Sequence, residues 1–492
     1  MIRCSRCVDW KKDYSSFMNY RLLRIFLILS LFFAPLFITQ SYAEEEFDLN
    51  ELLEGFEDNT PTGNNEESLD ELLQGFEESM QQTNRSFEPI EKRSWDLVTL
   101  LSLSSSYNYQ HEAPATDETD YRGLSRLKVK VQPEFRYKFN RRWDSVIIGN
   151  AFYDFAYRVN GRSQYTSETL DTYESELEFR DVYLRGTITE NFDIKLGRQI
   201  VVWGKADAIR VVDILNPLDF REPGMVDIED LRLPVTMFKA DYYVDDWNLS
   251  LITIPEIRFN KLPSYGSDFY VPDSKAPPES VPSDFENYEF AAALEGIFSG
   301  WDLSFYFAHY YDDMPHFVLN GSGQPIGQAH SKLNLLGVST NIAYRDWLIK
   351  VESAFIEGLE FASTDITFNR TDLLLGFDYS GFVDTTLTVE AVNRRLWDYD
   401  SVLSSSIDQT EGQVAFRYAG SFLHDKVNVV ALATILGLDF DAGSYYRGSI
   451  EYELMNATYI TFGGIIYQSG NHPLAKAIAR NDRVFMDFRV SF

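Results

Sequence analysis

The feature that most constrains this chain is a two-residue alternation of apolar and polar side chains that recurs from Leu97 to Phe492. Residues 126–139 show it most clearly, because apolar side chains occupy the odd positions, apart from Pro133, and polar or charged ones the even positions. This period sends successive side chains to opposite faces of a β-strand. The segment is longer than the usual globular strand of about five or six residues, but it suits a tilted strand that crosses a membrane.

Comparable segments recur along the whole body of the chain. They cover residues 97–109, 126–139, 144–158, 174–189, 192–203, 235–244, 247–256, 288–299, 301–311, 332–344, 347–358, 370–381, 385–396, 411–423, 426–437, 444–456, 458–468 and 483–492. We therefore expect an all-β fold for residues 96–492, a transmembrane antiparallel β-barrel of about 18 strands (16–18).

The links between these segments alternate between short and long. Tight links fall at 140–143, 190–191, 245–246, 300, 345–346, 382–384, 424–425 and 457, and mostly long links lie between them. Outer-membrane barrels show this pattern, with the short turns facing the periplasm. A soluble secreted β-protein, which is the competing all-β fold, has no reason to place its tight turns at one end.

The last segment carries a second membrane signal. Val484, Met486, Phe488, Val490 and Phe492 share one parity, and the chain ends on an aromatic residue. This resembles the C-terminal signal that the bacterial barrel-assembly machinery reads, so we expect Phe488, Val490 and Phe492 to form an assembly signal and that machinery to be a partner.

Aromatic residues make up 15% of the sequence, and four tryptophans lie at or beside tight links. They are Trp143, Trp247, Trp301 and Trp347. Aromatic rings gather at membrane interfaces, so these four predict a girdle at the periplasmic edge, in contact with outer-membrane lipids.

Residues 1–43 read as a signal peptide. Arg21 and Arg24 precede a short apolar run, and residues 41–43 (Ser-Tyr-Ala) supply a cleavage site before Glu44. The start can be Met1 or Met18. Both cysteines of the chain lie in this leader. An exported chain without disulfides must be stabilised by its core or by the membrane.

Residues 44–95 form an acidic segment that we expect to be largely disordered and periplasmic. It contains two LxELLxGFE-type repeats twenty residues apart, each with an apolar stripe at helical spacing. The stripes consist of Leu49, Leu52, Leu53 and Phe56, and of Leu69, Leu72, Leu73 and Phe76. Two copies of a docking motif for a partner's groove explain the duplication, and a solvated linker is the alternative.

Charge excludes one class of partner. The chain carries 44 Lys and Arg against 75 Asp and Glu, so no nucleic acid is expected to bind. Beyond the leader no apolar run of about 18 residues occurs, which excludes a helical membrane protein.

A barrel of this size encloses water unless a loop fills it, and its polar parity then faces the lumen. Opposed charge ladders would make the lumen selective, or alternatively brace the wall. The basic ladder includes Arg126, Lys128, Lys130 and Arg136, and the acidic one Glu176 and Glu178, joined by Arg180.

The long link 204–234 mixes apolar residues with charges such as Lys205, Asp207, Arg210 and Asp213. Apolar residues at that density favour burial, so we expect this link to fold inward as a constriction. A surface loop is the alternative.

At this link the sequence resembles a known family. Residues 196–204 (LGRQIVVWG), followed by 216–219 (NPLD), are similar to the GRQ-x-x-x-WG…NP-x-D signature of a porin-like Gram-negative outer-membrane family. That family is known mainly as a domain of unknown function, often encoded near exporters of the RND superfamily and a periplasmic companion protein. It is distantly similar to alginate-export barrels.

The resemblance implies an outer-membrane porin-like channel or conduit, part of a transport or export system with a periplasmic protein as partner. By the same resemblance the residues most worth testing are Arg198, Gln199, Trp203, Asn216 and Asp219.

A barrel enzyme, such as a lipid or peptide hydrolase, is the alternative function. The six histidines show no metal-ligand spacing, and no G-x-S-x-G, HExxH or cysteine nucleophile follows the leader. We therefore expect no enzyme, no cofactor, no metal and no catalytic residues.

Overall fold

The computed structural model describes residues 94–492, apart from 115–117, 227, 273, 363, 365, 401–402, 404–406, 438 and 440. The signal peptide and the repeat leucines lie outside the described residues, so those expectations stay predictions. Eighteen antiparallel strands form one sheet that closes on itself, because β1 pairs with both β2 and β20. The barrel prediction, including its strand number, is therefore confirmed.

The wall strands have the following bounds: β1 Trp95–Asn108, β2 Gly123–Lys138, β3 Trp143–Asp154, β4 Ser175–Thr189, β5 Phe192–Gln199, β6 Val235–Val244, β7 Trp247–Ile254, β8 Glu289–Phe298, β9 Trp301–Tyr311, β12 Lys332–Tyr344, β13 Trp347–Leu359, β14 Phe368–Phe382, β15 Thr385–Leu396, β16 Thr410–Phe422, β17 Val427–Leu436, β18 Gly443–Met455, β19 Thr458–Gln468 and β20 Arg483–Ser491. The described parts of the links contain a separate hairpin and five short helices: β10 His316–Leu319, β11 Pro325–Ala329, α4 Ala156–Val159, η1 Arg162–Gln164, α5 Ser167–Tyr173, α6 Ile228–Leu231 and α7 Pro473–Ile478.

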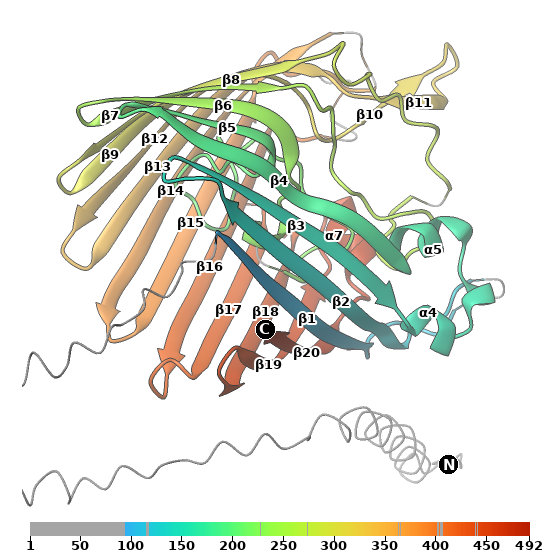
Figure 1. Cartoon of the computed structure of the whole chain (residues 1–492). Coiled ribbons are helices and arrows are strands. Elements are labelled where there is room, and N and C mark those ends of the chain that lie inside the picture. The colour runs from blue at the N-terminus through green and yellow to red at the C-terminus, as the bar shows by residue number, and fades with distance from the viewer. Residues whose placement is uncertain are drawn as a thin grey trace, which may run out of the picture. The chain divides into compact units, whose positions relative to one another are not determined.

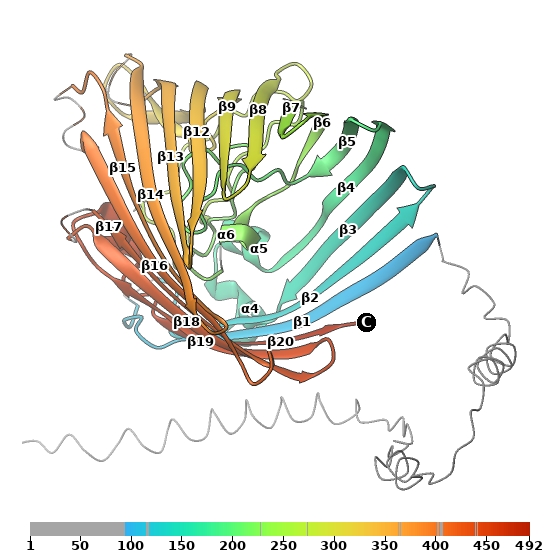
Figure 2. The ribbon, with the colours of Figure 1, turned by 90° about the vertical axis from the view of Figure 1, so that its left-hand side faces the viewer.

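Each strand pairs with its neighbours in chain order, except that β9 pairs with β12 across the small hairpin β10–β11. The first and last strands lie side by side (Figure 1; Figure 2), with Leu100 opposite Ser491. All eight tight hairpin turns lie at the end of the barrel where β1 begins and β20 ends, and the long links lie at the other end. Several of these turns need a positive φ, as at Asp245, Gly300 and Arg345.

Two predicted strands end four residues earlier than expected. The strand expected at 192–203 ends at Gln199, because residues 200–203 turn into the barrel. The strand expected at 144–158 ends at Asp154, where α4 follows. Pro133 is accommodated in β2, because it faces Thr99 of β1 and the ladder to β3 is interrupted beside it.

The two faces of the wall differ in what they contact. Along β14, Leu373 and Leu375 are 48% and 47% exposed on the outside, whereas Leu374 between them is fully buried inside. An exposed apolar outer face on a closed sheet suits lipid.

The tryptophans of the predicted girdle begin β3, β7, β9 and β13, each directly after a tight turn. Trp301 stacks on Phe298 at 4.4 Å between ring centroids, and Trp347 contacts Tyr379 at 4.7 Å. These rings line the tight-turn end of the barrel, as expected at a membrane interface. Among the described residues, no helix has the length and apolar character to cross a membrane. The protein is an outer-membrane-type β-barrel.

Candidate functional site in the barrel lumen

The link between β5 and β6, residues 200–234, lies inside the barrel, and we call it the inward segment (Figure 2). Its residues Ile209, Val211 and Val212 are buried in one apolar cluster with Leu335 and Leu374 of the wall. The structure therefore places this link inside, as expected, and not on the surface.

The inward segment packs on only one side of the lumen. The wall residues in its cluster come from β6–β9 and β12–β16, and they make the inner face apolar along that arc. Inner positions elsewhere remain polar, as on β2 with Arg126, Lys128 and Lys130. Strict alternation of apolar and polar residues did not predict this apolar inner arc. The sequence signal that could have predicted it is a run of consecutive apolar residues within a strand, such as residues 373–375.

Two wall carboxylates bind the backbone of the inward segment. Glu390 of β15, fully buried, accepts hydrogen bonds from the backbone N–H groups of Asp207 (2.7 Å), Ala208 (2.9 Å) and Ile209 (3.1 Å). Glu352 of β13 likewise accepts from three backbone N–H groups, at residues 205, 206 and 212. Hydrogen bonds to ionised acceptors are strong, so these two glutamates anchor residues 205–212.

Lysines complete the anchor. The buried Lys350 of β13 forms an ion pair with Asp207 and, at 2.8 Å, with Asp378 of β14, and it lies 3.7 Å from Glu390. Lys205 of the inward segment lies 3.2 Å from Asp302 of β9. A buried cation needs such partners to offset its loss of hydration.

Asn216 ties the two ends of the inward segment together. Its Oδ1 accepts from the Val201 N–H at 2.8 Å, and its Nδ2 donates to the Leu233 carbonyl at 2.9 Å. Gln199, fully buried, donates from Nε2 to the Met237 carbonyl of β6 at 3.2 Å. These two amides therefore fix the points where the chain leaves and rejoins the wall.

Trp203 and Asp213 act inside the segment. The Trp203 ring lies 4.9 Å from the ring of Tyr306 on β9, and the backbone N–H of Trp203 donates to Asp213 Oδ1 at 3.1 Å. Asp213 also forms ion pairs with Arg232 at 2.9 Å and with Arg210 at 3.3 Å. Gly204, at φ +82°, lies so close to Glu352 that a side chain there would displace the anchor.

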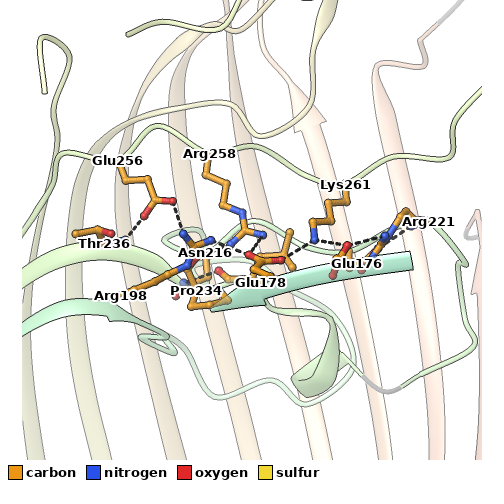
Figure 3. A network of polar contacts seen from close by, with 12 residues as sticks. Glu176, Glu178, Arg198, Asn216, Arg221, Pro234, Thr236, Glu256, Arg258 and Lys261 are labelled. Atoms are coloured by element: carbon orange, nitrogen blue, oxygen red, sulfur yellow. Dashed lines mark hydrogen bonds and ion pairs between the residues drawn. The ribbon is translucent and has the colours of Figure 1, made fainter. Parts of the chain in front are cut away.

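Arg198 is directed into the lumen by a local distortion of β5. Gly197 before it has φ +121°, a conformation that residues other than glycine rarely adopt. The Arg198 guanidinium donates to Glu178 of β4 at 2.8 Å and to Glu256 at 2.9 Å (Figure 3). Glu256 also accepts from the Thr236 N–H, so Arg198 joins the ends of three strands.

The acidic pair of β4 is fully engaged with cations (Figure 3). Glu178 contacts Arg258 at 2.6 Å and Lys261 at 2.9 Å, besides Arg198. Glu176 contacts Lys261 and Arg221, each at 2.9 Å. A further carboxylate, Asp219, pairs with Arg221 at 2.6 Å. Glu176 and Glu178 thus brace loops against the wall, which agrees with the bracing alternative for these two residues.

The basic row of β2 behaves differently. A polar cavity of 590 Å³ lies between the inward segment and the inner faces of β1–β4 and β17–β20, and Arg126, Lys128, Lys130 and Arg180 line it. Lys128, Lys130 and Arg180 form no hydrogen bond or ion pair with the described residues, and the Lys128 ammonium lies 4.3 Å from the centre of the Phe152 ring. Arg136 lies nearer the tight turns, outside this lining, and pairs with Glu134.

Arg126 pairs with Glu222 of the inward segment. Burial alone would raise the pKa of Glu222, but Arg126, Lys128 and Arg483 outweigh it and lower that pKa to about 2. Glu222 therefore stays ionised at neutral pH and fixes the segment to the polar side as well.

A second cavity, of 1160 Å³, lies on the long-link side and is mostly apolar. Its lining includes Phe220, Phe259, Leu262, Phe269 and Phe317. Arg417 of β16 also faces it and forms no hydrogen bond or ion pair with the described residues. Sequence reasoning missed this cavity, because its lining comes from several links that converge only in the folded chain.

The enzyme alternative gains little from the geometry. Ser331 lies 3.2 Å from His316 Nδ1, and His316 Nε2 lies 3.4 Å from Glu360. Ser331 is buried and Glu360 half exposed, which reverses what an accessible nucleophile with a buried orienting carboxylate requires. Across the described part of the chain, no group of three His, Cys, Asp or Glu could hold a metal ion.

Comparison with solved structures finds outer-membrane barrels. A BenF-like porin from Pseudomonas fluorescens Pf-5 is 11% identical, with 81% of this chain and 98% of that chain covered and a TM-score of 0.48. Acinetobacter baumannii OccAB1 is 8% identical, with 81% and 96% covered and a TM-score of 0.48. OmpT, an outer membrane protein of Vibrio cholerae, is 10% identical, with 81% and 97% covered and a TM-score of 0.39. At TM-scores below 0.5 these similarities identify no substrate.

No match was found among curated proteins. A family model described as "Protein of unknown function (DUF1302)" matches residues 115–422 and includes both the inward segment and the basic row. Since that match covers more than half of the sequence, the chain belongs to the DUF1302 family.

Proposed function

We propose that this protein is an outer-membrane channel, narrowed by the inward segment, that passes anionic solutes as the outer-membrane part of a transport system. The observation that carries the proposal is the polar cavity beside the inward segment, where Lys128, Lys130 and Arg180 lie without an ion-pair partner among the described residues. An unpaired basic row attracts anions, and low-dielectric walls strengthen that attraction.

The basic row of the polar cavity contrasts with the negative charge of the whole chain. The sequence has a net charge of −31, yet the basic side chains of the polar cavity outnumber its acidic ones. A local excess of positive charge in an acidic protein favours selection of anions over wall bracing for these three residues.

Transport as part of an export system is supported by the acidic repeats, which offer two docking stripes for a periplasmic protein. Those repeats lie outside the described residues, so this part of the proposal rests on sequence alone.

The test is planar-bilayer conductance of the folded protein in a salt gradient. We expect ohmic steps with anion preference, and a severalfold loss of that preference in the double variant Lys128→Gln/Lys130→Gln. The matched control is Lys138→Gln, on the same strand and parity but outside the cavity lining. Absence of conductance from protein shown to be folded would refute the channel.

A further inference from the structure

The barrel wall is incomplete at one place on the long-link side. β4 has 15 residues, but it pairs with β5 only from Val182 onward, since the ladder begins with Val182 opposite Arg198. Residues 175–181 of β4 pair with β3 on one edge, and on the other edge face no strand among the described residues. We call this unpaired edge the wall gap.

The strands beyond the gap are short. β5 and β7 have 8 residues each, against 13 in β12 and β13. A spanning strand needs about 9–11 residues, so β5 and β7 fall short of the hydrocarbon thickness on their own. Counted from the tight turn that follows β4, residues 175–181 come after the first eight residues of the strand, so they lie near the outer boundary of the hydrocarbon layer.

Loop segments close the gap from inside, and they do so mainly with side chains. Residues 218–221 and 258–261 meet through a short parallel bridge, in which the Phe220 N–H donates to the Lys261 carbonyl at 2.8 Å and the Lys261 N–H to the Leu218 carbonyl at 2.9 Å. We call these two segments the plug. Their Arg221, Arg258 and Lys261 side chains hold Glu176 and Glu178 of the unpaired edge (Figure 3).

The two sides of the plug differ in character. Its charged side chains face β4, whereas Leu218, Phe220 and Phe259 line the apolar cavity of 1160 Å³. On the outer surface of β4, Leu177 and Phe179 are 86% and 65% exposed. Apolar surface therefore lies on both sides of a closure that depends on ion pairs.

Opening such a closure differs from opening the rest of the wall. Elsewhere the strands exchange backbone hydrogen bonds, which cannot be left unsatisfied in lipid. At the gap, only side-chain contacts between β4 and the plug must separate. These contacts are ion pairs whose side chains are 12–21% exposed, and water and lipid headgroups can replace the partners once they separate.

We propose that the wall gap is a lateral portal through which apolar molecules with a single anionic group pass between the outer leaflet and the apolar cavity. This deepens the proposed channel function and rests on it, because it names a substrate class and an entry route for the same lumen. The cavity supplies the apolar environment, and Arg417, which has no ion-pair partner among the described residues, supplies the charge for the anionic end.

The test uses the mature protein in liposomes that contain a palmitate derivative with a diazirine on its chain. After illumination, peptides that carry lipid adducts are mapped by mass spectrometry. We expect adducts on outer residues such as Leu177 and also on cavity residues such as Phe259 and Leu262. In Glu176→Gln/Glu178→Gln, which weakens the closure without changing its shape, cavity adducts should increase severalfold.

A second variant, in which the plug is cross-linked to β4, tests the opposite effect. Because no described residue is a cysteine, Glu178→Cys/Lys261→Cys can be bridged with a short bis-maleimide, which should abolish cavity adducts and leave outer adducts unchanged. The matched control bridges Glu451→Cys/Arg489→Cys, an ion pair that spans the fully paired strand β19 and should have no effect.

The outcomes separate the two proposals. Adducts confined to the outer face, or cavity adducts that neither variant changes, would overturn the portal. Cavity adducts that respond to both variants, in a protein that shows no ionic conductance, would support the portal and refute the channel.

Discussion

The anchor at Glu390 allows a quantitative prediction for Glu390→Gln. The carboxylate accepts three backbone hydrogen bonds, two of them at Oε2, from Ala208 and Ile209. Glutamine keeps one carbonyl acceptor and turns an amide group toward N–H donors, so one or two of the three bonds are lost. Hydrogen bonds to a charged group contribute about 1.5–3 kcal/mol each.

In the released state, residues 205–212 have left the wall. Allowing for partial relaxation, Glu390→Gln should lower the free energy needed to reach this state by about 2–4 kcal/mol, which raises its population roughly 30- to 700-fold. The wall itself should survive, because β15 keeps its ladders to β14 and β16. Lys350 also keeps Asp207 and Asp378 as partners.

The assay is the modification rate of Ala208→Cys by a water-soluble maleimide, measured with and without Glu390→Gln. A retained heat-dependent gel shift shows that the barrel is intact. Maleimide modification that proceeds through the released state should accelerate by the same roughly 30- to 700-fold factor. The single-channel current should also become noisier. Glu451→Gln, a lumen carboxylate that does not contact the inward segment, is the control and should change neither. Equal rates in the folded Glu390→Gln protein would refute the anchor.

Three further predictions concern folding, assembly and partners. Gly197→Ala should lower the temperature of the heat-dependent gel shift, because a Cβ at φ +121° meets the Val182 carbonyl; an unchanged transition would contradict this. Deleting Phe492 removes two backbone hydrogen bonds to Thr99 and the terminal aromatic ring, so the yield of inserted barrel should fall, whereas normal insertion would rule out the assembly signal. Deleting residues 44–80 should leave the gel shift intact but abolish co-purification of a periplasmic protein; a retained partner would exclude the repeats as its docking site.

The architecture could be predicted from sequence because local signals identify each strand. Side-chain alternation and turn chemistry act over two to four residues, so the strands at 235–244 and 385–396 were delimited to the residue. The inward path of residues 204–234 could also be anticipated, since apolar density without alternation requires burial away from lipid.

The site itself could be predicted only in part. Lys128 and Lys130 follow from parity, but the roles of Glu352 and Glu390 do not, because their partners are backbone N–H groups at least 140 residues away. The family signature pointed to Arg198 and Asn216 without saying what they contact. The structure shows both joining the ends of strands and of the inward segment.

The apolar inner arc has a consequence for biogenesis. Residues 373–375 are apolar on both sides, so β14 cannot lie exposed to water on either face while the chain crosses the periplasm. Its inner partner, the inward segment, is exported earlier, whereas its outer partner is the bilayer. We therefore expect the inward segment to dock on the wall while strands are still being added, and not after an empty barrel has closed. Because such long-range contacts slow folding, we expect this chain to depend on chaperones for longer than a barrel with a water-filled interior.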